Sequence, residues 1–445
     1  MARSCYDFPS RRIRLNDFLL LLARNRNYRY TWTSQVVSEI GDHFNNIAVF
    51  SLAMDRTRSG MVVTGVMLSR AIPVILAGPI AGVLLDRWDR RSIMIASDLV
   101  RAVVAAGFLL TLTYPSNGLL YLLSGLLMFA SPFFTAGRSA ILPAIASREE
   151  LHTANSLTQT TQWLTLTVGA FAAGKAVAIF GYEWAFALNS FSFVVSGWAV
   201  SRLKGGEEGF RARKMSLTET DVARPWHEYR EGLAYLSRSP LILGIALVGV
   251  GWATGGGAAQ ILFSLFGEVV FERGASGIGT IWAFAGIGLV VGATLAHRLG
   301  PRLSFSAYKR AISLCYVVHG GAYILFSQAQ SFAAALFYIA LSRAAVAVSS
   351  VLNVSQLLRH VPDEYRGRVF ATNESLTWST MMLSMAAAGI ASQHHDPRVL
   401  GVWAGAASAS TAIFWGWANW TGRLPEPAVA GVDPDDVEVH GEVRV

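Results

Sequence analysis

The stretch MVVTGVMLSRAIPVILAGPIAGVLL, residues 61–85, runs directly into DRWDRR, residues 86–91. The first part is predominantly apolar and is longer than the roughly 20 residues with which a helix crosses a bilayer. The second part carries a charge at every position but Trp88, and apolar sequence resumes at Ile93. This alternation predicts two membrane spans joined by a short charged loop, and it sets the interpretation of the rest of the chain.

The composition of the whole chain is that of a membrane protein. Of its 445 residues, 53% are hydrophobic and 15% are charged, whereas globular domains average about 25% charged residues. Long apolar runs recur along the chain, as at residues 241–270. A soluble core cannot bury that many apolar segments, so we expect an all-α polytopic membrane protein.

The basic residues that give the chain its net charge of +8 lie between the apolar runs. They gather before the first run, after the second, in the middle of the chain and after the eighth, whereas residues 114–118 and 327–330 contain no Lys or Arg. By the positive-inside rule, the basic segments and both termini are expected to be cytoplasmic. No basic face is interleaved with exposed aromatic residues, so nucleic acid is not an expected partner.

Twelve spans are predicted, six on each side of a polar middle segment. The expected spans are residues 30–54, 61–85, 92–113, 119–145, 154–180, 184–203, 241–270, 276–297, 306–326, 331–358, 365–391 and 399–420. The corresponding domains are a basic cytoplasmic segment (1–29), a six-helix bundle (30–203), a cytoplasmic linker with a short helix near 226–236 (204–239), a second six-helix bundle (240–420) and an acidic, disordered tail (421–445).

The two halves resemble each other weakly. The sequence GxxxDR at residues 82–87 follows the second span, and GxxxAHR at residues 292–298 follows the eighth, about 210 residues later. SREELHTANSL at residues 147–157 and PDEYRGRVFATNESL at residues 362–376 open the fifth and eleventh spans. This repetition predicts two pseudo-symmetric bundles with a substrate site between them near the middle of the membrane.

The charged loop predicts a contact between the two halves. Gly82 permits close approach of another backbone, and Asp86 is placed where it could meet the positive N-terminus of the eleventh span, near residues 364–367. We call this predicted contact the latch, because it would hold the cytoplasmic side in one conformation. Plain anchoring by arginines at the headgroups is the alternative, but it gives no reason for Asp86. The other members of this gating loop are Arg87, Arg90, Arg91, Asp98 and Arg101.

The loop resembles the Gly-x-x-x-Asp-Arg-x-Gly-Arg-Arg sequence that joins the second and third helices of the major facilitator superfamily. Asp89 replaces the usual Gly, a form found in the branch that includes the enterobactin and macrolide exporters. Four further stretches are similar to that branch: SEIGD (38–42), SDLVRA (97–102), AGRSAILP (136–143) and RGRVF (366–370).

The resemblance covers about residues 30–420. It implies twelve helices in two bundles, alternating access, and export driven by the proton gradient. The antiporter sequence of the fifth span is only partly kept, because Gly169-Ala170 stands where Gly-Pro is usual and Lys175 stands where a small or apolar residue is expected.

Four polar residues share one face of the first span. Gln35, Glu39, Asp42 and Asn46 are spaced by four, three and four positions. An ionisable residue at mid-bilayer costs roughly 2.5–3.5 kcal/mol, so each should face a cavity or a partner. Facing a cavity, Asp42 could exchange its proton for a cationic substrate and so couple export to protons. The alternative is a hydrogen-bonded seam between helices.

Arg138 and Glu374 are the next candidate residues of a central cavity. In the superfamily arrangement the first and fourth helices line the cavity together, so Arg138 could meet Asp42 or an anionic substrate, or bind the charged loop instead. Glu374 could line the cavity or pair with Arg343.

Other intramembrane residues have more than one possible role. Arg70 could pair with Asp42 or only support its own helix. Asp98 and Arg101, three residues apart, are expected to pair with each other. Tryptophans that could stack on a flat aromatic substrate are Trp163, Trp252 and Trp378.

These features favour a secondary active exporter of a small organic molecule, such as a drug, a siderophore or a secondary metabolite. We expect a monomer in a bacterial plasma membrane, with protons as the coupling ion and with no metal or other cofactor, because neither a phosphate-binding loop nor metal-ligand spacing is evident. The alternatives are an importer of the same fold, a non-transporting sensor, or a membrane-embedded enzyme, which would need a cluster of carboxylates.

Overall fold

The computed structural model describes residues 15–205, 210 and 220–427, without the side chains of residues 15, 148, 152, 220–228 and 363. Much of the basic first segment and all acids of the C-terminal tail except Glu426 therefore lie outside the described residues. The helices, in chain order, are α1 (Leu15–Arg24), α2 (Arg26–Thr57), α3 (Gly60–Arg87), α4 (Arg90–Gly107), α5 (Leu110–Thr113), α6 (Asn117–Ile145), α7 (Arg148–Phe180), α8 (Tyr182–Ser201), α9 (Thr220–Arg238), α10 (Pro240–Leu265), with its π-helical extension η1 (Phe266–Val270), α11 (Gly274–Leu299), the short η2 (Gly300–Arg302), α12 (Phe305–Gln328), α13 (Phe332–His360), α14 (Asp363–Ala391) and α15 (Pro397–Trp420).

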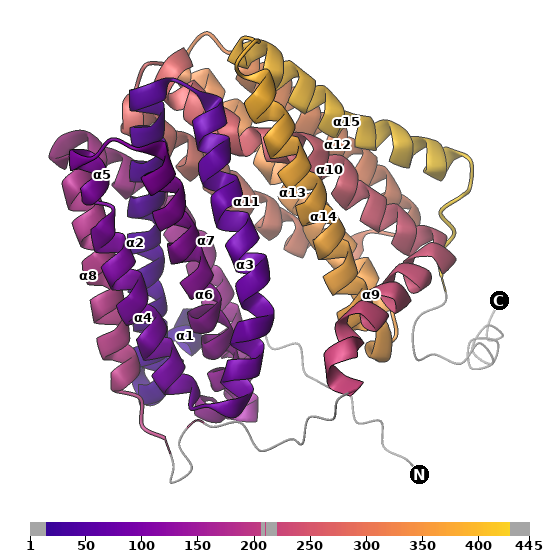
Figure 1. Cartoon of the computed structure of the whole chain (residues 1–445). Coiled ribbons are helices and arrows are strands. Elements are labelled where there is room, and N and C mark those ends of the chain that lie inside the picture. Colours follow the sequence, from indigo (N-terminus) through magenta and orange to yellow (C-terminus); the bar gives the residue numbers. More distant parts are fainter. Residues whose placement is uncertain (1–14, 206–209, 211–219, 428–445) are drawn as a thin grey trace, which may run out of the picture.

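Each of the twelve predicted spans is a helix, with α4 and α5 together forming the third (Figure 1). By length and composition, nine helical segments of the described chain are apolar enough to cross a membrane. Three of the twelve predicted spans, α2, α8 and α14, fall outside that group. Two of them, α2 and α14, carry the candidate carboxylates Asp42 and Glu374.

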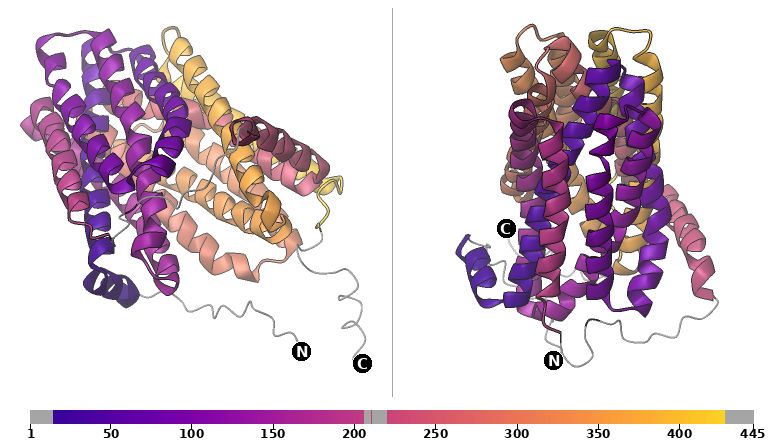
Figure 2. Two further views of the ribbon diagram at one scale, coloured as in Figure 1. Left: turned by 60° about the horizontal axis from the view of Figure 1, so that its bottom comes forward. Right: turned by 60° about the vertical axis from the view of Figure 1, so that its left-hand side comes forward.

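The helices form two six-helix bundles with the same packing pattern. In the first bundle α2 packs on α7 and α8, α3 on α6, and α4 on α6 and α8. In the second bundle α10 packs on α14 and α15, α11 on α13, and α12 on α13 and α15. If the twelve spans are numbered in chain order, with α2 as the first and α10 as the seventh, adding six to each span number of the first set gives the second set. The predicted pseudo-symmetric fold is confirmed, and Figure 2 shows the two groups of helices side by side.

The bundles meet through α7 against α11 and through α3 against α14. Both contacts depend on glycine, because a Cβ atom on Gly174 would lie 2.7 Å from the Ala275 carbonyl oxygen and one on Gly60 would lie 3.0 Å from the Ser392 Cβ atom. We call the end of the molecule where α9 lies the α9 end. Gly60 and Ser392 lie at the far end from α9, which we call the opposite end.

At the α9 end the two bundles are apart. Among the described residues, Cβ atoms added to Gly78 and Gly82 of α3 or to Gly367 of α14 would meet no other atom within 4 Å. Figure 1 shows α3 and α14 separating toward the end where α9 lies. The bundles are therefore closed together at the opposite end and open at the α9 end.

The short helix expected in the linker is present as α9 and is longer than predicted. It packs on α14: Arg368 forms an ion pair with Glu231 at 2.9 Å, and the rings of Tyr235 and Tyr365 stack with centroids 4.9 Å apart. These contacts fix α9 to the second bundle, so it is expected to move with α14.

Candidate functional site

A cavity of about 660 Å³ lies between α3 and α14, where the two bundles face each other. We call it the methionine cavity, because its walls include Met67, Met128, Met381, Met382 and Met385. Trp378 also lines it, and its two ionisable groups are Arg70 and Glu374, of which Glu374 is exposed to the cavity. Methionine side chains are flexible and polarisable, so such a wall adapts to apolar molecules of different shape.

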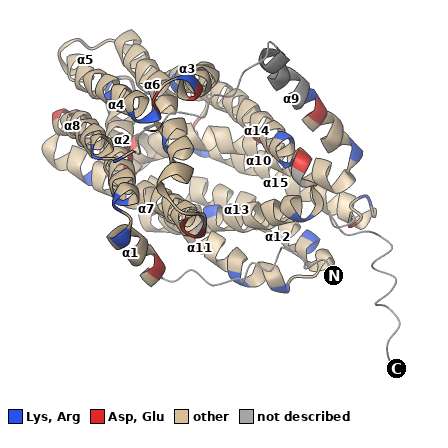
Figure 3. Cartoon of the chain, turned by 90° about the horizontal axis from the view of Figure 1, so that it is seen from below, with Lys and Arg blue, Asp and Glu red and all other residues tan. Residues whose placement is uncertain are grey.

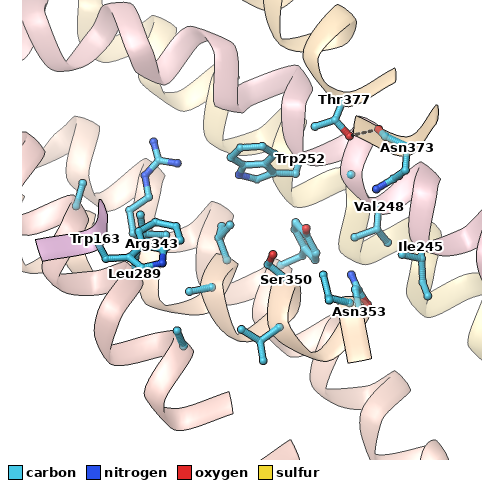
Figure 4. A pocket seen from close by; sticks show the side chains of 18 of the residues that line it. Trp163, Ile245, Val248, Trp252, Leu289, Arg343, Ser350, Asn353, Asn373 and Thr377 are labelled. Atoms are coloured by element: carbon cyan, nitrogen blue, oxygen red, sulfur yellow. Dashed lines mark hydrogen bonds between the residues drawn. The ribbon is translucent and has the colours of Figure 1, made fainter. Parts of the chain in front are cut away.

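A second cavity, of about 450 Å³, extends into the C-terminal bundle between α10, α11, α13 and α14, with α7 on one side. We call it the tryptophan cavity, after Trp163, Trp252 and Trp282 in its wall. Figure 4 shows Arg343 and Trp252 projecting into it from separate helices. Gln260 lines both cavities, so they adjoin at α10.

The three tryptophans that the sequence singled out as stacking candidates all line these cavities. Trp163 and Trp252 belong to the tryptophan cavity and Trp378 to the methionine cavity. Within the described residues, no three His, Cys, Asp or Glu side chains come together in a way that could hold a metal ion.

The Glu39 carboxylate on α2 is hydrogen-bonded to side chains of two neighbouring helices, α6 and α7. Its carboxylate accepts a hydrogen bond from Gln35 at 2.9 Å, one from Thr165 of α7 at 2.7 Å, and a charge-assisted bond from Arg138 of α6 at 3.3 Å. Arg138 therefore meets Glu39 and not Asp42. These contacts match the seam between helices that the sequence left as the alternative for Glu39.

Asp42, one turn further along α2, has no such partner. Its side chain is half-buried, and its Oδ1 atom is buried without a hydrogen bond from any described residue. Arg101 and Arg70 both act electrostatically on its carboxyl group. Buried polar atoms are normally hydrogen-bonded, so an orphaned carboxyl oxygen indicates a site for water or a bound ion.

Arg70 connects the surroundings of Asp42 with the methionine cavity. Its guanidinium lines that cavity and donates hydrogen bonds to the side-chain oxygens of Asn46, at 2.5 Å, and Asn45, at 3.4 Å. The polar face of α2 thus reaches the cavity wall through Arg70. Its Nε atom and the Asn45 amide nitrogen are buried without partners among the described residues, as expected for a hydrated polar pocket.

The pair that the sequence predicts between Asp98 and Arg101 is present and fully buried. Ser196 of α8 donates a second hydrogen bond to Asp98 at 2.7 Å. The guanidinium of Arg101 lies 4.5 Å from the ring centroid of Phe134 and 4.4 Å from that of Phe193. The pair therefore ties α4 to α6 and α8 in the middle of the bundle instead of supporting the charged loop.

The charged loop is held by backbone groups of its own bundle. Arg90 donates to the Ala140 carbonyl at 2.7 Å and Arg91 donates to the Ser201 carbonyl. Asp89 caps α4 by accepting hydrogen bonds from Ser92. Burial opposes its charge, but the bonds from Ser92 and Phe210 outweigh that effect and lower the pKa of Asp89.

Asp86 and Arg87 are exposed at the α9 end, and Asp86 makes no hydrogen bond or ion pair with any described residue. At the start of α14, Tyr365 and Arg368 contact α9, and a Cβ atom on Gly367 would meet no other atom within 4 Å. The latch contact is therefore not made in this conformation, because the bundles are separated at this end.

Several cavity residues could not be predicted from local sequence patterns. Arg343 was considered only as a partner of Glu374, yet the two line different cavities. The five methionines come from three helices far apart in sequence, and no local pattern relates them. Trp282 and Gln260 were likewise not expected.

The chain is similar to known transporters over most of its length. The model of the Major Facilitator Superfamily matches residues 30–383. The putative bacilysin exporter BacE of Bacillus subtilis is 26% identical, over 78% of this chain and 84% of that protein. Macrolide efflux protein A of Streptococcus pyogenes is 25% identical, over 80% and 85%. A bacterial homologue of the iron transporter ferroportin, solved in an inward-facing state, superposes with a TM-score of 0.67 at 16% identity, over 90% and 98%.

Proposed function

The chain belongs to the major facilitator superfamily, and we propose that it is a secondary active exporter of a small organic molecule, coupled to protons. The observation that carries this proposal is the methionine cavity between the two bundles, where an adaptable apolar wall meets Arg70 and Glu374. The direction of transport is supported by relatives named as exporters of bacilysin and macrolides.

The α9 end is the cytoplasmic end in this proposal. Seen from that end, the ribbon positions of Lys and Arg gather at the ends of helices and on the connecting segments (Figure 3). By the positive-inside rule such an end would be cytoplasmic. The proposal accordingly has both termini in the cytoplasm and the protein in the bacterial inner membrane, as expected from the sequence. Open at the α9 end, the protein would load its cargo from the cytoplasm, as an exporter must.

Asp42 is the proposed proton carrier. Its carboxyl oxygen has no protein partner, and Arg70 links its surroundings to the cavity wall. Glu39 is less suited to carry a proton, because its carboxylate already accepts hydrogen bonds from three side chains. A proton that enters from outside would neutralise Asp42, change its attraction to Arg70 and Arg101, and so favour one of the two conformations.

We expect a disulfide across the opposite end to stop transport. After replacement of Cys5 and Cys315 by serine, the variant Gly60→Cys/Ser392→Cys should cross-link on oxidation. The Cβ atoms would lie about 3.0 Å apart in the present packing, so α3 and the end of α14 have to move apart slightly to reach the roughly 3.5–4.5 Å of disulfides. Alternating access needs this end to open, so transport should fall to background and return with a reductant. Gly60→Cys alone serves as the control, and cross-linked protein that transports normally would contradict alternating access.

We expect Asp86→Asn to slow the cycle without weakening substrate binding. Asp86 is far from both cavities and would act only when the α9 end closes onto the N-terminus of α14. A lost charge–dipole contact of about 0.3–1 kcal/mol corresponds to about two- to fivefold slower turnover. Turnover in vesicles and binding to purified protein check this, with Glu149→Gln at the same end as the control. Normal turnover, or lost binding, would argue against the latch.

The function itself is tested with everted membrane vesicles and a panel of drugs and siderophores. Accumulation of at least one compound that rises with an imposed pH gradient and disappears with a protonophore is the expected result. Movement in the opposite sense would make the protein an importer. Failure of every compound to respond to the gradient would overturn proton-coupled export.

A further inference from the structure

Arg343 is a buried cation without a partner. It lies on α13 with 7% of its surface exposed, and it makes no hydrogen bond or ion pair with any described residue. Its guanidinium projects into the tryptophan cavity (Figure 4). An unpaired buried charge costs several kcal/mol, so a protein that retains one normally supplies a counter-charge at some stage of its function.

The other two buried arginines of the described chain, Arg70 and Arg101, each have side-chain acceptors for part of the guanidinium, although the Nε atom of each is without a partner. Arg101 pairs with Asp98, and Arg70 donates to the amide oxygens of Asn45 and Asn46. Arg343 instead rests over the ring of Phe263, 5.1 Å from its centroid. A ring face attracts a cation but accepts no directed hydrogen bonds, so the donors of this guanidinium remain free.

The groups around Arg343 are neutral. Its electrostatic neighbours are the phenol of Tyr323 and the imidazole of His319, with no carboxylate among them. His319 is itself engaged with Ser342 of α13, at 2.7 Å from its hydroxyl. The charge of Arg343 is therefore not compensated from within the described structure.

The same cavity contains two further donors without acceptors. The indole nitrogens of Trp252 and Trp282 are buried and have no hydrogen-bond partner among the described residues. Trp282 packs edge-on against Phe263, with ring centroids 5.0 Å apart, so it shares that ring with Arg343. An indole N–H can only donate. The wall also contains one buried acceptor without a partner, the Asn373 side-chain oxygen. The cation and the two N–H donors outnumber it, which makes this part of the cavity complementary to an anion.

We propose that Arg343, with Trp252 and Trp282, binds a carboxylate group of the transported molecule. This inference rests on the proposed function and specifies its substrate class as organic acids with an apolar body. The carboxylate occupies the tryptophan cavity, and the apolar body extends past Gln260, which lines both cavities, onto the methionines. The planar guanidinium suits a carboxylate because it donates two parallel hydrogen bonds.

Direct binding to the purified full-length protein, in nanodiscs of neutral phosphatidylcholine and without any gradient, tests this proposal. The probes are 2-naphthaleneacetate and its uncharged amide, compared by calorimetric titration. The wild-type protein should bind the acid about tenfold or more tightly than the amide, as for charge-assisted pairs. Arg343→Gln should abolish this preference while it leaves amide binding unchanged, and Arg343→Lys should keep part of it. Arg298→Gln, which removes an exposed cation from the same bundle, should keep all of it.

Equal binding of acid and amide by the wild-type protein, or binding of neither, overturns the proposal. So does an undiminished preference in Arg343→Gln. If that variant does not fold, Trp252→Phe/Trp282→Phe decides, since it removes the two N–H donors and keeps the rings; an unchanged preference again overturns the proposal. Because no gradient is present, these outcomes are independent of proton-coupled export, which the vesicle assay tests separately.

Discussion

Asp42→Asn is expected to abolish gradient-driven transport while the protein remains folded in the membrane. Asparagine keeps the size and the hydrogen-bonding oxygen of the side chain, but it cannot bind and release a proton. Since Asp42 has a buried carboxyl oxygen without a protein partner, the substitution breaks no hydrogen bond that holds the bundle together. Everted vesicles should show uptake reduced to the level without a gradient, a loss of about tenfold or more for a group essential to coupling.

The control for this prediction is Asp55→Asn, the same change at an exposed position near the other end of α2. It should leave gradient-driven transport near the wild-type rate. Asp42→Glu should retain part of the activity, because the ionisable group is kept. Wild-type transport by Asp42→Asn would remove Asp42 from the mechanism.

Among single substitutions that remove one charged group, Asp98→Asn is expected to destabilise the protein most. The substitution leaves the guanidinium of Arg101 buried between two aromatic rings without its counter-ion. Breaking a buried pair from one side costs about 3–5 kcal/mol. The expected result is a large fall in the melting temperature measured by size-exclusion chromatography after heating, with much less protein recovered from membranes.

The matched control is Glu426→Gln, which removes an acid from the exposed pair with Arg359, 3.7 Å apart. Exposed pairs contribute about 0–1 kcal/mol, so its melting temperature should change little. The double variant Asp98→Asn/Arg101→Met should regain part of the stability lost in Asp98→Asn, because it no longer buries a lone charge. A melting temperature for Asp98→Asn equal to that of the wild type would show that the pair does not stabilise the bundle.

Helix boundaries show where apolar periodicity alone falls short. The fifth span was predicted from residue 154, where the apolar run begins, but α7 starts at Arg148. Ser147 and Glu150 form a capping box that extends the helix through polar sequence. This signal is local, and the S-x-x-E pattern could have been recognised. The same holds for α2, which starts at Arg26 behind the N-cap Asn25.

The sequence by itself determined the number of spans, the division into halves, the family-like loop and the polar face of α2. These depend on hydropathy, charge placement and helical spacing, which are local properties of the chain. Only the tertiary structure decided that Arg138 meets Glu39 and that Asp42 has a buried carboxyl oxygen without a hydrogen bond. It also decided that Arg343 has no ion-pair partner among the described residues, and that methionines from α3, α6 and α14 share one wall. Which charges meet is fixed by the rotation and separation of packed helices, and spacing within one helix carries no information about the face that its neighbour presents.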